Sequence, residues 1–298
     1  MEKKIRSREA YRIDVPPEAD FETFRNATSI PYSKTTYDEH GNILEDVKFD
    51  DFGVMTGKSV YTYDEHGKLS GEETYDETGE LEEKLSFERD EQGRLIRQYV
   101  HYLDGSKDTI HHEYDEDGHL IRKVLEDEDG EVEREEIARY SDGRVVQEEV
   151  YEEGELVKKN VFAYDDHGNV IEAGVMNEDE DSTLVNEYDE NGNRVKYLKY
   201  DVENNLVEKH LMLYDSNNRV VEIVEENPYK QITLEIGYDE KGNAVSQRET
   251  NRAGMLNHEL ERDYDPQGNV LEVRAFVAGQ GQMPDRKYLL LYKYEFFE

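Results

Sequence analysis

The sequence contains no cysteine and no tryptophan, and only six prolines among its 298 residues. Without cysteine, disulfide bonds, thiolate metal sites and cysteine nucleophiles are excluded. No stretch approaches the roughly 18 consecutive apolar residues that a membrane-spanning helix needs. The opening segment "MEKKIRSREAYRIDVPPEADF" has basic residues but no apolar run after them, so it predicts no secretory signal peptide. These absences favour a cytoplasmic protein, with export by another route left open.

Apolar residues and positive charge are also scarce. Hydrophobic residues make up 35% of the chain, and 36 Lys and Arg face 73 Asp and Glu, for a net charge of -37. Such a composition usually indicates disorder, but 22 tyrosines, nine phenylalanines and regularly spaced β-branched residues favour a thin, ordered structure. The acidic surface repels nucleic acid and anionic membranes, so a partner selected by charge is basic. The alternative is that the acidity only keeps exposed strands from pairing with other chains.

A short turn sequence recurs along the chain, from "YDEHGN" at Tyr37 to "YDPQGN" at Tyr264. The turn glycine, or the residue in its place, occurs ten times at spacings of 24 to 26 residues, which predicts a repeat architecture. The complete copies chosen as structural turn residues are Tyr37, Asp38 and Gly41; Tyr63, Asp64 and Gly67; Tyr114, Asp115 and Gly118; Tyr164, Asp165 and Gly168; Tyr188, Asp189 and Gly192; Tyr238, Asp239 and Gly242; and Tyr264, Asp265 and Gly268.

The residue types of these copies predict hairpin turns. An aspartate at the first position can accept a bond from the backbone N–H two residues on, and a glycine at the fourth can take the left-handed conformation. Asn218 stands in one glycine position, Arg89 stands in one tyrosine position, and "YSDG" after Arg139 is one residue short. Weaker turns, for example at Gly79 and Gly130, lie between the main ones. Each unit of about 25 residues is therefore expected to hold two strands and two turns.

The fold class predicted is all-β: a continuous antiparallel β-hairpin repeat of about ten such units, forming a long twisted sheet that coils. Residues 1–30 are expected to form an N-terminal arm or cap with a short helix after Pro17. Residues 31–280 form the repeat array, and residues 281–298, with the apolar sequence "RKYLLLYKYEFFE", form a closing strand. The alternative for this last strand is a docking edge through which chains self-associate.

The repeated "YDEHGN", "YDDHGN", "YDENGN" and "YDEKGN" resemble the YD repeat of RHS-type proteins, over residues 32 to about 272. That resemblance implies hairpins wound into a shell around a toxin, and some such proteins are linked to carbohydrate or cell-surface binding. This chain is far shorter than those proteins and shows no toxin domain or self-cleavage segment. It is also similar, more distantly, to MORN-like hairpin repeats, including proteins described as antitoxins, although only "YDENGN" at Tyr188 approaches their motif.

The residues predict no catalytic, metal or cofactor site. "LEDEDGEVEREE" resembles a calcium loop at Asp127, Asp129, Gly130 and Glu136, but Leu125 occupies the first ligand position. Turn aspartates on one sheet edge recur about 9.6 Å apart, too far to share one calcium ion. The isolated histidines at His40, His66 and His167, the adjacent His111 and His112, and "TGKS" at Thr56 carry no site signal. With 73 acidic residues, carboxylate pairs arise by chance.

The tyrosine column has two interpretations. Because each tyrosine is tied to a turn, packing across the hairpin is favoured over stacking on sugar rings. The sequence therefore predicts a non-enzymatic, protein-binding repeat protein that engages a basic protein, such as a toxin or effector, in an immunity- or chaperone-like role. The alternative is a carbohydrate- or cell-surface-binding module that uses rows of tyrosines on a curved sheet.

Overall fold

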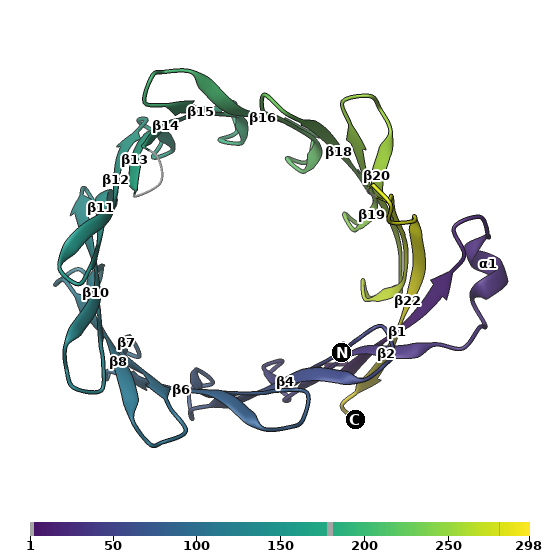
Figure 1. Cartoon of the computed structure of the whole chain (residues 1–298), viewed down its shortest axis with the longest axis horizontal. Coiled ribbons are helices and arrows are strands. Elements are labelled where there is room, and N and C mark those ends of the chain that lie inside the picture. The colour runs from purple at the N-terminus through teal and green to yellow at the C-terminus, as the bar shows by residue number, and fades with distance from the viewer. Residues whose placement is uncertain (1–2, 178–180, 280) are drawn as a thin grey trace. The chain divides into compact units, whose positions relative to one another are not determined.

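Antiparallel strands make up almost the whole chain in its computed structural model, which describes residues 3–177, 181–279 and 281–298 (Figure 1). Twenty-two strands belong to one sheet, slightly more than the twenty or so expected. The strands run from 7 to 11 residues. The all-β class and the antiparallel hairpin pairing predicted from the turn spacing are confirmed.

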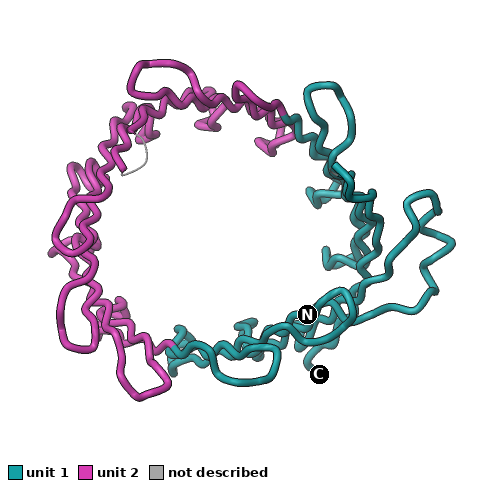
Figure 2. The backbone as a smooth tube through the Cα atoms, in the orientation of Figure 1, with its two compact units in different colours: residues 1–84, 232–298 teal, residues 85–231 magenta. Residues whose placement is uncertain are grey.

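The first compact unit comprises residues 1–84 and 232–298 (Figure 2). Its strands pair in the order β5, β4, β3, β2, β1, β22, β21, β20, β19 and β18. Their bounds are β1 Ile5–Val15, β2 Ile30–Tyr37, β3 Ile43–Phe49, β4 Met55–Tyr63, β5 Leu69–Tyr75, β18 Gln231–Tyr238, β19 Ala244–Asn251, β20 Leu256–Tyr264, β21 Val270–Val277 and β22 Arg286–Phe296.

The second compact unit comprises residues 85–231, and β6 (Leu81–Arg89) crosses the boundary between the units. Within it successive strands from β7 to β17 pair with one another. The bounds are β7 Leu95–His101, β8 Lys107–Tyr114, β9 Leu120–Glu126, β10 Val132–Ser141, β11 Arg144–Glu152, β12 Glu155–Tyr164, β13 Val170–Asn177, β14 Ser182–Tyr188, β15 Arg194–Asp201, β16 Leu206–Tyr214 and β17 Val220–Glu226.

The first and last strands of the sheet pair with each other, which corrects the predicted coil. β1 lies between β2 and β22 (Figure 1), and its register with β22 sets Ile13 opposite Leu289. In the first unit, therefore, neither terminal strand stands at an open end of the sheet. This closure of the two chain ends onto each other is favourable because an unpaired terminal strand leaves an edge of unpaired backbone groups. β21 pairs with the other side of β22 from Arg286 to Leu291, so this part of the strand has no free edge for docking a second chain, and self-association through the terminal strands stays a prediction.

The terminal segments contribute directly to this closure. Residues 5–15, expected within an N-terminal arm, form β1 itself, and α1 (Phe21–Phe24) is the short helix expected after Pro17. The division into residues 1–30, 31–280 and 281–298 stays a prediction. In the part of the chain that the structure describes, no helix is long and apolar enough to cross a membrane.

Few side chains are fully buried, as the composition requires. Of the twelve apolar residues that are buried in the described part of the chain, seven lie on β1, β21 and β22. The small core cluster consists of Ile13, Val15 and Leu289. We call residues 16–29, between β1 and β2, the α1 segment, and its residues Phe21 and Phe24 pack against this cluster. The α1 segment thus covers one face of the sheet where the two chain ends meet.

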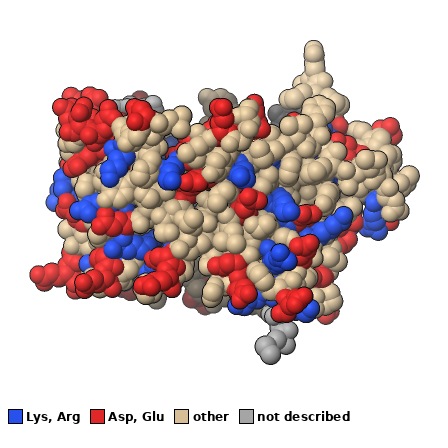
Figure 3. All heavy atoms as spheres, turned by 90° about the horizontal axis from the view of Figure 1, so that it is seen from below, with Lys and Arg blue, Asp and Glu red and all other residues tan. Residues whose placement is uncertain are grey.

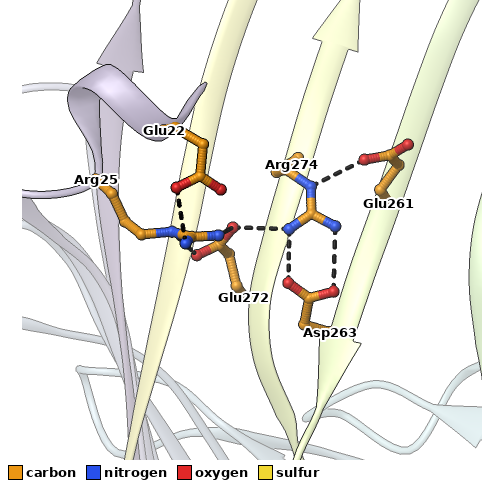
Figure 4. Close-up of polar contacts among 6 residues, drawn as sticks. All are labelled: Glu22, Arg25, Glu261, Asp263, Glu272 and Arg274. Carbon is orange, nitrogen blue, oxygen red and sulfur yellow. Dashed lines mark hydrogen bonds and ion pairs between the residues drawn. The ribbon is translucent and has the colours of Figure 1, made fainter. Parts of the chain in front are cut away.

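An ion-pair network fixes the α1 segment to the sheet (Figure 4). The guanidinium of Arg25 donates to both oxygens of Glu272 on β21, each at 2.9 Å. Arg274 donates to Glu272 at 2.8 Å, to Asp263 on β20 at 2.6 and 3.1 Å, and to Glu261 at 2.9 Å. The bond from Arg274 lowers the pKa of the Asp263 carboxyl, and the same contact raises the pKa of Arg274. One arginine therefore bridges three clustered carboxylates.

Candidate functional site: the turn edges and the tyrosine ladder

The turns of the YD copies form one edge of the sheet, and the first copy shows how the motif works. Asp38 Oδ1 accepts bonds from the backbone N–H groups of His40 at 2.8 Å and Asn42 at 2.9 Å. The side chain of Asn42 donates to Asp38 Oδ2 at 2.8 Å. The N–H of Gly41 donates to the carbonyl of Asp38, and Gly41 has a φ of +92°, in the left-handed region. Asp, Gly and Asn of "YDxxGN" therefore each have a defined local role.

All seven complete copies occupy such turns. Each tyrosine is the last residue of its strand. Each aspartate is the first residue of a turn, and the glycine three residues later has a left-handed φ. In four copies the side-chain amide of the asparagine after the glycine donates to the turn aspartate. These bonds run from Asn169 to Asp165, from Asn193 to Asp189, from Asn243 to Asp239 and from Asn269 to Asp265. These bonds lower the pKa of Asp165, Asp189 and Asp239. The turn aspartates are thus already engaged within their own turns.

The deviating copies obey the same backbone rules. Asn218 has a φ of +60°, so it takes the left-handed conformation that glycine takes elsewhere. In "YSDG", Asp142 and Gly143 have φ values of +50° and +73°. Two successive positive φ values are typical of the two-residue type I′ turn, which accounts for the missing residue.

The tyrosines form a ladder between successive hairpins, which the sequence did not predict. In the bonds given below, each ring lies on one hairpin and its hydroxyl donates to a backbone carbonyl of the preceding hairpin. The accepting residue stands two positions after the preceding turn glycine, and Ile43, for example, pairs with Tyr37 of its own hairpin. The bonds join Tyr63 to Ile43 at 2.7 Å, Tyr114 to Leu95 at 2.9 Å, Tyr140 to Leu120 at 3.1 Å, Tyr188 to Val170 at 2.9 Å, Tyr214 to Arg194 at 2.9 Å, Tyr264 to Ala244 at 2.9 Å and Tyr294 to Val270 at 2.8 Å.

Several ladder rings are covered by side chains. Arg94 lies 4.9 Å from the ring centre of Tyr114, Arg144 lies 5.7 Å from that of Tyr164, and His119 stacks on Tyr140 at 4.6 Å. The covering residue in each case follows the preceding turn glycine. These contacts make the column a bridge between repeats, whereas the sequence predicted packing within each hairpin.

The opposite edge of the sheet carries a dense group of free carboxylates in the second unit. We define the acidic edge as seven exposed residues: Glu128, Asp129, Glu131, Glu133, Glu152, Glu153 and Glu155. The two turns that carry them are joined, because the N–H of Glu153 donates to the carbonyl of Glu133 at 2.9 Å. Among the described residues, one ion pair reaches this group, from Arg134 to Glu152 at 2.6 Å.

Apolar side chains lie among these carboxylates. Val132 is 47% exposed, Leu156 is 39% exposed, and Leu103 on the neighbouring β7–β8 turn is 82% exposed. Tyr102 on that turn donates to Asp108, and this bond, together with burial and nearby carboxylates that include Glu133, raises the pKa of its hydroxyl to about 12. The acidic edge therefore combines unpaired negative charge with exposed apolar surface.

Charge is sorted by position on a strand. Figure 3 shows Asp and Glu side chains gathered toward both strand-end edges of the visible face, with Lys and Arg in a band between them. Basic side chains near the strand middles pair across strands, for example Arg139 and Lys159 with the buried Glu149, each at 3.2 Å. Burial opposes ionisation of Glu149, but these two bonds outweigh it and lower its pKa. The excess negative charge is thus concentrated at the turns.

One group of potential metal ligands was not predicted. Asp115, Asp117 and His119 bring ligand atoms within 4.8 Å of one another in a single YD turn. His119 Nδ1 already bonds to Asp115 Oδ2 at 2.9 Å, so turn capping explains the group. The calcium-like segment forms an ordinary turn, in which Asp127 Oδ1 accepts from the N–H groups of Asp129 and Glu131. Its last residue, Glu136, lies on β10 and bonds to Arg134 at 3.0 Å.

A shallow hollow of about 330 Å³ lies on the second unit, lined by residues that include Ala138, Tyr140, Glu148 and Asn160. The amide of Asn160 donates to Glu148 at 3.0 Å, while its buried Oδ1 has no hydrogen-bond partner among the described residues. The hollow would accept a small donor group, but its other charged side chains bear both signs and select no particular ligand.

Comparison with known proteins gives no functional assignment. A family described only as "Uncharacterised protein" matches residues 141–271, which is less than half of the chain. No curated protein matches the sequence. A solved porin-like protein from Bacteroides uniformis is 10% identical over 98% of both chains, with a TM-score of 0.34. A zinc-containing peptidase from Vibrio cholerae is 12% identical over 73% of this chain and 85% of its own, with a TM-score of 0.13. Likenesses this weak carry no argument about activity.

Proposed function

We propose that this chain is a non-catalytic binding protein whose acidic edge engages a basic segment of another protein. The observation that carries the proposal is the acidic edge itself: seven exposed carboxylates on two joined turns, one of them with a basic partner. A structural role alone does not call for unpaired charge at this density, because like charges on neighbouring turns repel one another. A basic partner would remove that repulsion on binding.

The exposed apolar residues determine which kind of partner fits best. Exposed ion pairs contribute mainly to the rate of association and to specificity, whereas apolar burial contributes most of the affinity. Val132, Leu156 and Leu103 provide such surface among the carboxylates. The partner is therefore a basic segment that also carries apolar side chains, as in a Lys- and Arg-rich toxin or effector. An immunity- or chaperone-like role in an RHS-type toxin system, in the cytoplasm, belongs to this proposal.

The experiment is affinity capture from lysate of the native organism at low ionic strength (about 0.05 M) and then at high (about 0.5 M). We expect a basic protein to be retained at low salt and eluted at high salt. In a second arm, Glu128→Gln, Glu131→Gln and Glu153→Gln are combined. The matched control combines Glu116→Gln, Asp166→Asn and Glu190→Gln on the YD edge, so both variants change the net charge from -37 to -34.

The two triple variants separate a local site from a general charge effect. Loss of the captured protein by the acidic-edge variant alone supports the proposal. Equal retention by both variants, or capture that does not respond to salt, would reject the acidic edge as the binding surface.

The carbohydrate-binding alternative stays a proposal with weaker support from the ladder. Arg94, Arg144 and His119 cover the rings of Tyr114, Tyr164 and Tyr140, so a sugar would have to displace them before stacking. Sugar stacking is also nearly insensitive to salt, unlike a complex that depends on charge. A glycan screen at both salt concentrations tests this alternative directly.

A further inference from the structure

A group of hydrogen-bond donors with few acceptors among the described residues lies where the chain ends meet, on the sheet face opposite α1. We define the seam patch as Arg8, Tyr32, Arg262, Tyr288 and Tyr292, all in the first unit. The register sets Tyr292 opposite Ala10 and Tyr288 opposite Ala275. These alternate with Leu289 and Leu291, whose side chains lie on the α1 side. The seam patch is therefore on the uncovered face of β1, β21 and β22.

Small residues form the floor beneath the two central tyrosines. Ala10 is 1% exposed and Ala275 is 0% exposed, so the rings of the neighbouring tyrosines cover them. Burial raises the pKa of Tyr292, and the positive charges of Arg8 and Arg262 act on it in the opposite direction. Both guanidinium groups are thus close enough to the phenol to affect its ionisation, although they come from β1 and β20.

The donors of the seam patch lack strong acceptors. The Nε–H of Arg8 is buried without a hydrogen-bond partner, and its Nη2 makes one long bond of 3.3 Å to Thr35. Arg262 also makes one long bond, of 3.3 Å, to Gln247. Within the described residues, neither arginine has a carboxylate partner, and the hydroxyls of Tyr288 and Tyr292 donate to no acceptor.

Among the residues that the structure describes, two neighbouring arginines, unlike Arg8 and Arg262, have carboxylate partners. Arg12, on the same strand as Arg8, pairs with Asp14 and Asp51, and Arg274 binds three carboxylates. In a chain with twice as many acidic as basic residues, most arginines find a carboxylate easily. Nearby Asp46 accepts from Thr35 at 2.8 Å and does not pair with Arg8. The seam patch is therefore a concentration of unsatisfied donors in an acidic protein.

We propose that the seam patch binds a small molecule that carries a carboxylate on a ring. Guanidinium groups donate paired, charge-assisted bonds to carboxylate oxygens, and Arg8 and Arg262 have donors to spare. Arg12 already lies over the ring of Tyr288, 4.8 Å from its centre, so the ring of Tyr292 would pack against the face of the ligand ring. The hydroxyls of Tyr288 and Tyr292 would donate to the ligand oxygens. The nearest carboxylates are already engaged, Asp46 by Thr35 and Asp51 by Arg12, and carboxylates farther away are largely screened beyond about 8 Å at physiological salt.

Four probes test this chemistry by isothermal titration: galacturonate, benzoate, acetate and galactose. Galacturonate and benzoate both carry a carboxylate on a ring, but one ring is a sugar and the other is aromatic. We expect at least one of them to bind saturably and at least tenfold more tightly than acetate, and we expect galactose not to bind. Which of the two binds more tightly identifies the source of the ligand. Equal binding of acetate, or of galactose, would overturn the proposal.

Variants locate the binding at the seam patch. Arg8→Gln and Arg262→Gln should each weaken binding of the better probe about tenfold or more, as expected for the loss of a charge-assisted bond. Tyr292→Phe removes only a hydroxyl, so it retains the fold and should weaken binding by a smaller factor. The matched control is Arg248→Gln, because Arg248 lies on neighbouring β19 in an exposed pair with Glu259 at 3.9 Å.

The outcomes are decisive in both directions. Wild-type affinity in the Arg8→Gln, Arg262→Gln double variant would place the ligand elsewhere and reject the seam patch. Absence of saturable binding by all four probes to the unaltered protein would reject it as well. Neither result bears on the acidic edge, which lies in the other unit and selects ligands of opposite charge.

Discussion

At the scale of single residues, the repeat is explained by hydrogen bonds within and between turns. Aspartate, glycine and asparagine of "YDxxGN" satisfy the turn itself, as in Asp38, Gly41 and Asn42. Tyrosine instead joins one turn to the one before it, as in Tyr63 and Ile43. The nearly constant spacing of 24 to 26 residues follows, because each hydroxyl must reach a carbonyl at a fixed place in the preceding hairpin.

Tyr264→Phe and Tyr188→Phe form an informative pair of variants. Each removes one hydroxyl donor and leaves the ring in place. The carbonyl of Val170, which Tyr188 reaches, also accepts from Asn186 at 3.0 Å, whereas Tyr264 is the side-chain donor to Ala244. We expect Tyr264→Phe to lower the free energy of unfolding by about 1 kcal/mol and Tyr188→Phe to lower it less. Urea denaturation measures both. Absent effects would show that the ladder bonds do not stabilise the fold, whereas equal losses would show that Asn186 does not compensate for the hydroxyl of Tyr188.

The turn chemistry could be predicted from the sequence, but the ladder could not. Asp–x–x–Gly specifies a local backbone conformation, so residues such as Asp165 and Gly168 reveal their role without knowledge of distant contacts. The bond from Tyr264 to Ala244 spans 20 residues and depends on how successive hairpins are staggered. The regular occurrence of tyrosine signalled a constraint, but it did not identify the accepting carbonyl.

At the scale of elements, the position of the α1 segment depends more on the ion pairs of Arg25 than on interactions within helix α1. α1 has four residues and no side-chain cap, so local interactions contribute little to its position. Arg25 binds Glu272, but Glu272 is held in turn by Arg274. The sequence predicted the short helix after Pro17. The network could not be predicted in the same way, because Arg25 and Glu272 are 247 residues apart.

Arg274→Ala should be more harmful than Arg25→Ala. Removing Arg274 leaves Asp263, Glu261 and Glu272 close together without their shared cation, at a cost of about 2–3 kcal/mol. Arg25 is 40% exposed, and Arg274 still neutralises Glu272 in its absence, so that loss should be smaller. Chemical denaturation gives both values. Arg274→Lys is the control, since it keeps the charge and should recover part of the loss, and a ranking in the opposite order would contradict the network.

At the scale of the whole molecule, pairing of β1 with β22 is the feature that the repeat pattern did not reveal. The turn spacing counts hairpins, and it carries no information about whether the last strand meets the first. The apolar sequence of β22 predicted a closing strand, and Leu289, at 0% exposed, shows where its side chains are buried. The strand it closes onto, β1, lacks the turn motif and was therefore assigned to an arm.

Deletion of residues 286–298 tests the importance of this closure. Without β22, both β1 and β21 would expose unpaired backbone edges, which are templates for pairing with other chains. The core cluster would also lose Leu289. We expect the shortened chain to form oligomers or aggregates in size-exclusion chromatography with light scattering. Leu289→Ala, which keeps the strand but should cost about 2–5 kcal/mol, is the comparison that should remain monomeric. A monomeric, folded deletion variant would mean that the edges are protected in another way.

Two opposing charge effects should give the protein a stability maximum in mildly acidic solution. At neutral pH and low salt, a net charge of -37 destabilises the folded chain by self-repulsion, so added salt should raise Tm. Lowering the pH toward about 5 begins to protonate surface carboxylates and should also raise Tm.

Further acidification should reverse the trend because of the turn aspartates. The folded-state pKa values of Asp165, Asp189 and Asp239 are lowered, so their contribution is present above the unfolded value of about 3.9 and is lost as the pH falls through the folded values. We therefore expect Tm to fall below about pH 4. Differential scanning calorimetry from pH 7 to pH 2.5 in low and high salt measures both the rise in Tm toward pH 5 and the fall in Tm below pH 4, here called the acid limb.

The triple variant Asp165→Asn, Asp189→Asn and Asp239→Asn should be less stable at pH 7 and should show a shallower acid limb. A steady fall in Tm from pH 7 to pH 5 at low salt would mean that self-repulsion is not the dominant charge effect, whereas an unchanged acid limb in the triple variant would mean that turn capping does not set the acid stability.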